Sequence, residues 1–145
     1  MKQQICILGS TGSIGRQALD VISSQSDRYE VYCLTAHRQA ELLAQQARRF
    51  QPAAVVIADE TKCESLRALL SDQPHIKVYT GRQALCDIVE ASPIDMVLTA
   101  MVGFSGLEPT LHAIRAGKKI CLANKETLVV AGELVCALAQ EHRAA

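Results

Sequence analysis

The sequence predicts an α/β fold of the Rossmann type: a doubly wound, mainly parallel sheet with helices on both faces. Two observations lead to this prediction. Short apolar runs alternate with amphipathic stretches along the chain, and the connections between them are short. Of the 145 residues, 49% are hydrophobic but only 3% are aromatic, so the core has to be aliphatic. An aliphatic core is typical of a parallel sheet buried between helices.

Each predicted strand is a short run rich in apolar residues. The first, at 5–8, is an apolar run ended by Gly9, and the third, at 53–58, is ended by Asp59. We predict strands at 5–8, 29–35, 53–58, 76–79, 95–100 and 119–123.

The predicted helices lie between these strands and place apolar residues at helical spacing. In the first helix these residues are Ile14, Ala18, Val21 and Ile22. We predict helices at 14–23, 39–50, 60–72 and 82–91, from 107 to a C-terminal glycine at 117, and from 126 onward.

A glycine-rich loop follows the first strand and opens the first helix. Gly9, Gly12 and Gly15 provide the tight turn, the close backbone approach and the helix packing that a dinucleotide diphosphate requires. The backbone amides of Thr11, Gly12, Ser13 and Ile14 would face the phosphates at the positive end of the helix. The alternative is a glycine-rich turn without a ligand.

The end of the second strand predicts which dinucleotide binds. An NAD site usually carries Asp or Glu here to bind the ribose 2′-hydroxyl, but this strand runs into His37, Arg38 and Gln39. A guanidinium suits a 2′-phosphate, so Arg38 favours NADP(H) over NAD(H). A solvated residue at the start of a helix is the alternative for Arg38.

The sixth strand ends in an amide, an ammonium and a carboxylate, at the sheet edge where ligands bind. Asn124 is predicted to bond the ribose or carboxamide, Lys125 to face a polar substrate, and Glu126 to bond a cofactor hydroxyl. An asparagine cap followed by a charged first helical turn is the structural alternative.

Composition argues against several classes of partner. Fifteen basic residues balance fifteen acidic ones, so the sequence shows no basic field for nucleic acid. No apolar run reaches the length of a membrane span, and no signal peptide is evident. The six cysteines lack metal-ligand spacing, which favours a reducing, cytoplasmic compartment, and no metal ligand is predicted in this chain.

Three segments resemble the 1-deoxy-D-xylulose 5-phosphate reductoisomerase family of the non-mevalonate isoprenoid pathway. They are ILGSTGSIG at 7–15, PTLHAIRAGK at 109–118 and LANKETLV at 122–129. The resemblance implies an NADPH-dependent oxidoreductase that rearranges and reduces its sugar phosphate to 2-C-methyl-D-erythritol 4-phosphate. It also implies a divalent metal ion (Mg²⁺ or Mn²⁺) and a homodimer for the full-length enzyme.

By this resemblance, residues 1–145 form the NADPH-binding domain, and the catalytic, metal-binding and C-terminal parts lie outside the chain. Carried over by motif, the cofactor contacts are Thr11, Gly12, Ser13, Ile14, His37, Arg38, Gln39, Asn124 and Glu126, and Lys125 contacts substrate. Family members often have Gly-basic-Asn where this chain has His37, Arg38 and Gln39. The chain alone is predicted to bind NADPH without catalysis.

Two other functions remain open from the residues alone. The domain could belong to another two-domain sugar dehydrogenase, or to an NADP(H)-sensing module that controls a partner. A short-chain dehydrogenase is excluded, because none of the three tyrosines has a lysine four residues later.

Overall fold

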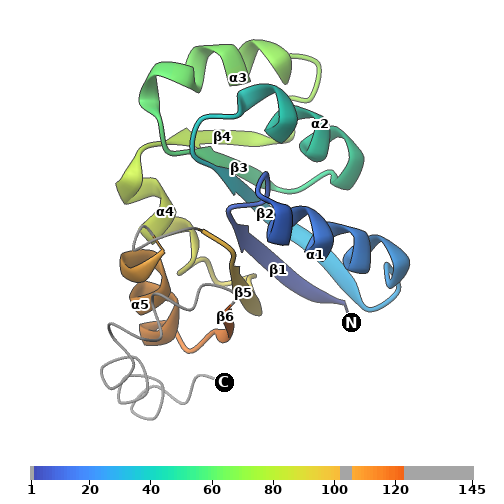
Figure 1. The fold of residues 1–145 in the computed structure, drawn as a ribbon, viewed down its shortest axis with the longest axis vertical. Coiled ribbons are helices and arrows are strands. Elements are labelled where there is room, and N and C mark those ends of the chain that lie inside the picture. Colours follow the sequence, from blue (N-terminus) through green and yellow to red (C-terminus); the bar gives the residue numbers. More distant parts are fainter. Residues whose placement is uncertain (1, 102–105, 123–145) are drawn as a thin grey trace.

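The computed structural model describes residues 2–101 and 106–122, which contain one six-stranded sheet (Figure 1). Its strands are β1 (Gln3–Leu8), β2 (Tyr29–Ala36), β3 (Ala54–Ile57), β4 (Lys77–Thr80), β5 (Met96–Thr99) and β6 (Lys119–Leu122). They lie in the order β4-β3-β2-β1-β5-β6, and all neighbouring pairs are parallel. The predicted fold class is confirmed.

Helices cover both faces of the sheet. They are α1 (Ser13–Ser24), α2 (Ala40–Phe50), η1 (Glu60–Lys62, a 3₁₀ turn), α3 (Cys63–Leu69), α4 (Arg82–Ile88) and α5 (Leu107–Arg115). One buried apolar cluster joins the sheet to α1, α2 and α3, and a second joins the opposite face to α4 and α5. Within the described ranges, no helix has the length and apolarity needed to span a membrane.

The alternation of side chains along the strands explains the two clusters. In β1, Ile5 and Ile7 belong to the first cluster, whereas Cys6 and Leu8 belong to the second. Successive side chains of a strand point to opposite faces, so a central strand with apolar residues at every position packs against helices on both sides. The continuous apolar run in the sequence therefore predicted this burial correctly.

Strand β2 contains an irregularity that simple alternation did not predict. Ile5 of β1 pairs with Val31, but the next residue, Cys6, pairs with Cys33, so Tyr32 is the extra residue of a bulge. Val31 before the bulge and Leu34 after it both belong to the first cluster. Because of the bulge, each later residue of β2 points to the face of the sheet opposite to the one that strict alternation would give.

Two helices are shorter than the sequence predicts. The stretch predicted as a helix at 60–72 is a 3₁₀ turn followed by α3, and the helix predicted at 82–91 ends at Ile88. Pro93 disfavours helical backbone in the residue before it, which is consistent with the turns that lead into β5. The helix predicted from 126 onward lies outside the described residues.

The order of the strands creates one switch point. β1 and β5 are neighbours in the sheet, yet the chain leaves β1 toward α1 on one face and leaves β5 toward α5 on the other. Connections that diverge in this way leave a crevice at the carboxyl ends of the two strands, where ligands of doubly wound proteins bind. Figure 1 shows α1 and α5 on opposite sides of the neighbouring strands β1 and β5.

Candidate functional site

A cavity of about 320 Å³ lies at this switch point. It is formed by the loop after β1, the end of β2 and the residues after it, one residue of α4, and the residues after β5. Its lining residues are Gly9, Thr11, Gly12, Thr35, Ala36, His37, Gln39, Leu85, Ala100 and Met101. The sequence predicted the first two of these segments as parts of one site, and the structure brings them together.

Gly9 makes the turn out of β1 and also allows two loops to touch. Its φ is +88°, a backbone conformation that is unfavourable for residues with a Cβ atom. A Cβ atom added here would lie 3.0 Å from the carbonyl oxygen of Ala100 and 3.2 Å from the amide nitrogen of Met101. The backbone after β1 therefore lies directly against the backbone after β5.

The glycine loop is held by a buried polar network that the sequence analysis did not identify. The amide of Gly9 donates to Thr35 Oγ1 (2.9 Å), and the amide of Ser10 donates to the Thr35 carbonyl (2.8 Å). The Ser10 hydroxyl donates to Gln46 Oε1 (2.7 Å), and Gln46 Nε2 donates back to the Ser10 carbonyl (2.9 Å). The buried face of α2 thus anchors the loop.

One signal in the sequence could have revealed Gln46. It stands on the core-facing side of α2 beside Leu43 and Ala47, where a polar side chain needs a buried partner. The role of Thr35 had no comparable signal, because a threonine is common in any strand.

Replacing Gln46 with leucine should lower the free energy of unfolding by about 2 kcal/mol, because the Ser10 carbonyl loses its buried donor. Urea titration followed by circular dichroism measures this change. Gln45→Leu is the matched control, because Gln45 precedes it on the same helix but is exposed. Equal losses in the two variants would show that the network contributes nothing.

The start of α1 is open to an anion. Gly12 is the N-cap residue, and no side chain caps the helix. Among the described residues, the amides of Thr11, Ser13 and Ile14 have no hydrogen-bond acceptor, as is usual for the first turn of a helix. Thr11 is buried against the cavity, whereas the side chain of Ile14 is 44% exposed.

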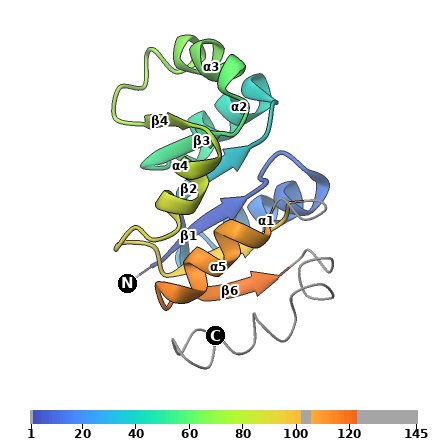
Figure 2. The same ribbon diagram turned by 90° about the vertical axis from the view of Figure 1, so that its left-hand side faces the viewer.

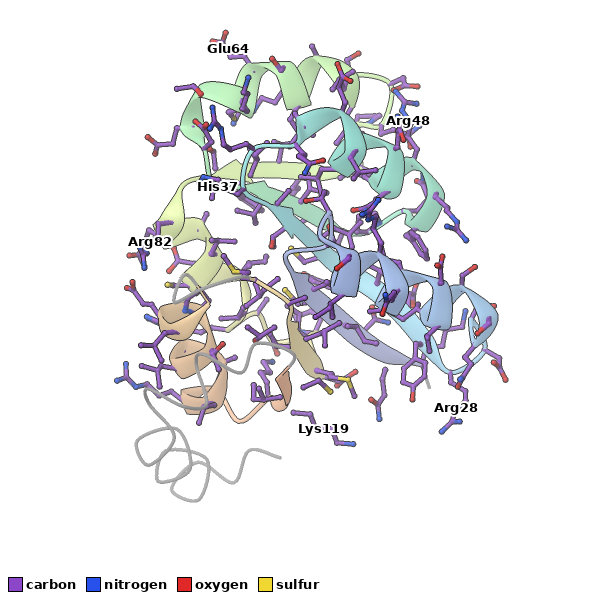
Figure 3. All side chains as sticks on the ribbon, in the orientation of Figure 1. Arg28, His37, Arg48, Glu64, Arg82 and Lys119 are labelled. Carbon is purple, nitrogen blue, oxygen red and sulfur yellow. The ribbon has the colours of Figure 1, made fainter. Side chains whose placement is uncertain are left out.

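The three residues after β2 divide between two hollows. His37 and Gln39 line the switch-point cavity, and Figure 3 shows His37 at the edge where β2 and β3 end. Arg38 lines an adjoining surface hollow of about 660 Å³, which it shares with Gln39. The three predicted residues therefore lie together, but the guanidinium is on the outer side.

Asp59 is a further residue of this region that the sequence did not reveal. It follows β3, and its Oδ2 lies 3.2 Å from Nε of Arg38. Its amide donates to the His37 carbonyl (2.9 Å), so it holds both residues. Hydrogen bonds from the hydroxyl and amide of Thr61, together with the charge of Arg38, keep the pKa of Asp59 below its usual range. A carboxylate thus does lie at this edge, supplied by β3 rather than β2.

The third group of predicted residues, Asn124, Lys125 and Glu126, lies outside the described residues. The strand before them, β6, is described as far as Leu122 and ends beside β5, its neighbour in the sheet.

A parallel, doubly wound sheet with a glycine-rich loop at its switch point defines a domain of the Rossmann class. The comparisons with known proteins are more specific. The sequence matches the family 1-deoxy-D-xylulose 5-phosphate reductoisomerase over residues 5–132. The protein of that name from Bacteroides fragilis is 63% identical over 142 residues, which cover 98% of this chain and 36% of the relative.

Solved structures agree. The reductoisomerase of Zymomonas mobilis in complex with NADPH has a TM-score of 0.93 and 38% identity, over 99% of this chain and 38% of that one. A DOX-P reductoisomerase in complex with NADPH, fosmidomycin and magnesium has a TM-score of 0.93 and 36% identity, over 98% of this chain and 35% of that one.

This chain belongs to the 1-deoxy-D-xylulose 5-phosphate reductoisomerase family. It spans a little more than a third of the length of the curated relatives that it matches, 36% in the case of the Bacteroides fragilis protein.

Proposed function

We propose that this chain is the NADPH-binding domain of a 1-deoxy-D-xylulose 5-phosphate reductoisomerase and binds the cofactor across the switch point of its sheet. The observation that carries the proposal is the uncapped first turn of α1, which opens beside the cavity at the carboxyl edge. The NADPH complexes among the solved relatives support it.

The diphosphate of NADPH is assigned to Thr11, Gly12, Ser13 and Ile14. The amides of the first helical turn are donors that need acceptors, and a helix N-terminus favours negative charge. The Thr11 and Ser13 hydroxyls are available for further bonds. Gly12 suits the closest approach, because a Cβ added there would meet only the Gly9 carbonyl oxygen at 3.8 Å among the described neighbours.

The adenosine end is assigned to His37, Arg38 and Gln39. Asp59 lies nearest to Nε of Arg38, and the planar guanidinium has further N–H donors that can bind a 2′-phosphate. The Arg38 side chain is 65% exposed, so a phosphate in solvent can reach it despite the ion pair with Asp59.

Arg38→Ala should weaken NADPH binding by about 1.5–3 kcal/mol, the usual value of a hydrogen bond to a charged group, and leave NADH binding almost unchanged. Isothermal calorimetry of both nucleotides on the 145-residue chain measures the difference. An equal loss for both nucleotides would contradict the assignment of the 2′-phosphate to Arg38.

Arg28→Ala is the control for a general loss of positive charge. Arg28 is exposed in the turn before β2, at the opposite edge of the sheet from His37 (Figure 3). If the unaltered chain gives no heat with NADPH, the proposed function itself is wrong.

In the whole protein, we propose that Asn124 and Glu126 contact the cofactor and that Lys125 contacts the sugar phosphate. Bound NADPH would supply the hydride that reduces the aldehyde formed by the rearrangement, which gives 2-C-methyl-D-erythritol 4-phosphate. The described lining of the cavity contains no carboxylate, so we assign no ligand of the catalytic Mg²⁺ or Mn²⁺ to it.

The proposal also covers the full-length protein and the catalytic competence of this chain alone. The full-length protein acts as a cytoplasmic homodimer, and this chain alone binds NADPH without turning over substrate. The chain supplies cofactor binding, and residues beyond the described cavity supply the metal site and most of the substrate contacts. The family membership supports this division, because the chain corresponds to 36% of its Bacteroides fragilis relative.

A further inference from the structure

A cluster of side chains with metal-ligand chemistry lies between α4 and α5, separate from the proposed cofactor site. Cys86 of α4 and Glu108 and His112 of α5 each place one ligand-type atom within 4.8 Å of the others. Within residues 2–101 and 106–122, no other group of three His, Cys, Asp or Glu side chains does so. The two helices lie side by side in both ribbon views (Figures 1 and 2).

Helical spacing explains how α5 contributes two of these groups. Glu108 and His112 are four residues apart, so they lie on the same face of the helix, one turn from each other. Cys86 comes from the facing helix and is fully buried. The thiol is therefore at the inner end of the cluster, and the carboxylate and imidazole are nearer to solvent.

A fourth side chain orients the imidazole. Glu90 is four residues after Cys86, in the turn that follows α4, and its Oε1 is hydrogen-bonded to Nδ1 of His112. Histidines that ligate metals usually donate one ring N–H to a carboxylate in this way, which fixes the ring and leaves the other nitrogen for the ion.

We propose that Cys86, Glu108 and His112 bind one Zn²⁺-class cation, with Glu90 supporting His112 and water completing the coordination. A thiolate, an imidazole and a carboxylate form a typical zinc ligand set, whereas Mg²⁺ prefers oxygen ligands alone. The site would be distinct from any catalytic Mg²⁺ site and does not depend on NADPH binding.

The charges around the thiol are compatible with a cation. Burial, together with the negative charges of Glu108 and Asp87, raises the pKa of Cys86 to about 11, so without metal the group is a neutral thiol. Metal binding would displace its proton to solvent. The positive charge of Arg82 opposes the cation, since its Nε lies 3.4 Å from Glu108 Oε2. The Arg82 side chain is 67% exposed and can turn away; Figure 3 shows it at the outer end of α4.

Spacing along the chain could not have indicated this site. The sequence prediction found no metal-ligand spacing around any cysteine, because the partners of Cys86 lie more than twenty residues away on another helix. Only the packing of α4 on α5 brings them together.

The experiment is a titration of the reduced, chelator-treated 145-residue chain with Co²⁺, followed by Zn²⁺. We expect a thiolate-to-cobalt charge-transfer absorption band that saturates at one Co²⁺ per chain. One equivalent of Zn²⁺ should abolish this band, whereas excess Mg²⁺ should leave it intact. Saturating Zn²⁺ should raise the melting temperature by about 5 °C, since an ion that binds only the folded chain stabilises it.

Variants distinguish this site from other thiols. Cys86→Ala should abolish the charge-transfer band, and His112→Ala, at a partly exposed position, should weaken Co²⁺ binding at least tenfold. Glu90→Gln should weaken it about tenfold through loss of the supporting carboxylate, and Arg82→Gln should strengthen it. Cys121→Ser, at an exposed cysteine of β6, is the control and should leave the band intact. A band that survives Cys86→Ala or disappears with Cys121→Ser would overturn the proposal.

Discussion

Gly15→Ala is expected to destabilise the domain by more than about 3 kcal/mol or to prevent folding. A Cβ atom at position 15 would lie 2.3 Å from the Gly9 carbonyl oxygen and 2.7 Å from Cα of Ser10. These atoms belong to the backbone and cannot rotate away as the end of a side chain could. Overpacking against a fixed backbone exceeds the gain of about 1 kcal/mol that alanine brings to a helix.

Gly12→Ala is the matched control, three residues earlier in the same loop. Its nearest neighbour would be the Gly9 carbonyl oxygen at 3.8 Å, which is ordinary contact, and its φ of −76° suits alanine. Chemical denaturation of the two variants should therefore give a large loss for Gly15→Ala and a change below about 1 kcal/mol for Gly12→Ala. Similar stabilities would show that the loop adjusts and that α1 does not pack closely on the loop after β1.

Lys118→Met should lower the free energy of unfolding by roughly 3 kcal/mol. The Lys118 side chain is buried, and its Nζ donates to the carbonyl oxygens of Ala91 (2.8 Å) and Ile94 (2.6 Å). These carbonyls belong to the connection from α4 to β5, so the ammonium ties that connection to the start of β6. Hydrogen bonds from a charged donor contribute about 1.5–3 kcal/mol each, and methionine fills similar volume without replacing them.

Lys119→Met tests whether the effect depends on the contact or only on charge. Lys119 is the next residue and is exposed, so its loss should change stability by less than about 0.5 kcal/mol. Thermal unfolding of both variants at the same pH measures the contrast. If the two substitutions have equal effects, the buried ammonium is not a structural link.

Much of the fold could be predicted from the sequence, because the signals for it are local. The apolar run ended by Gly9 fixes β1 as a central strand, and Gly117 marks the end of α5 within two residues. The bounds of α3 and α4 were less predictable. There, a 3₁₀ turn or other turns replace three predicted helical residues at an end, and the free-energy difference between these conformations is small.

The candidate site was predictable only where its groups are contiguous in the chain. The glycine loop and the segment at 37–39 each form a motif, and residues of both line the cavity at the switch point. The partners that hold them, Gln46 and Asp59, come from other elements and act through tertiary contacts. Sequence spacing carries no information on such contacts.

The extra residue in β2 has a consequence for the glycine loop after β1. Before Tyr32 the odd-numbered residues face the side of α1 and α2, and after it the even-numbered residues do. Thr35 can therefore hold the glycine loop while Leu34 and Ala36 remain in the apolar layer. A strictly alternating strand of the same sequence would have to exchange these roles, so the extra residue lets one short strand serve both the apolar core and the anchoring of the glycine loop.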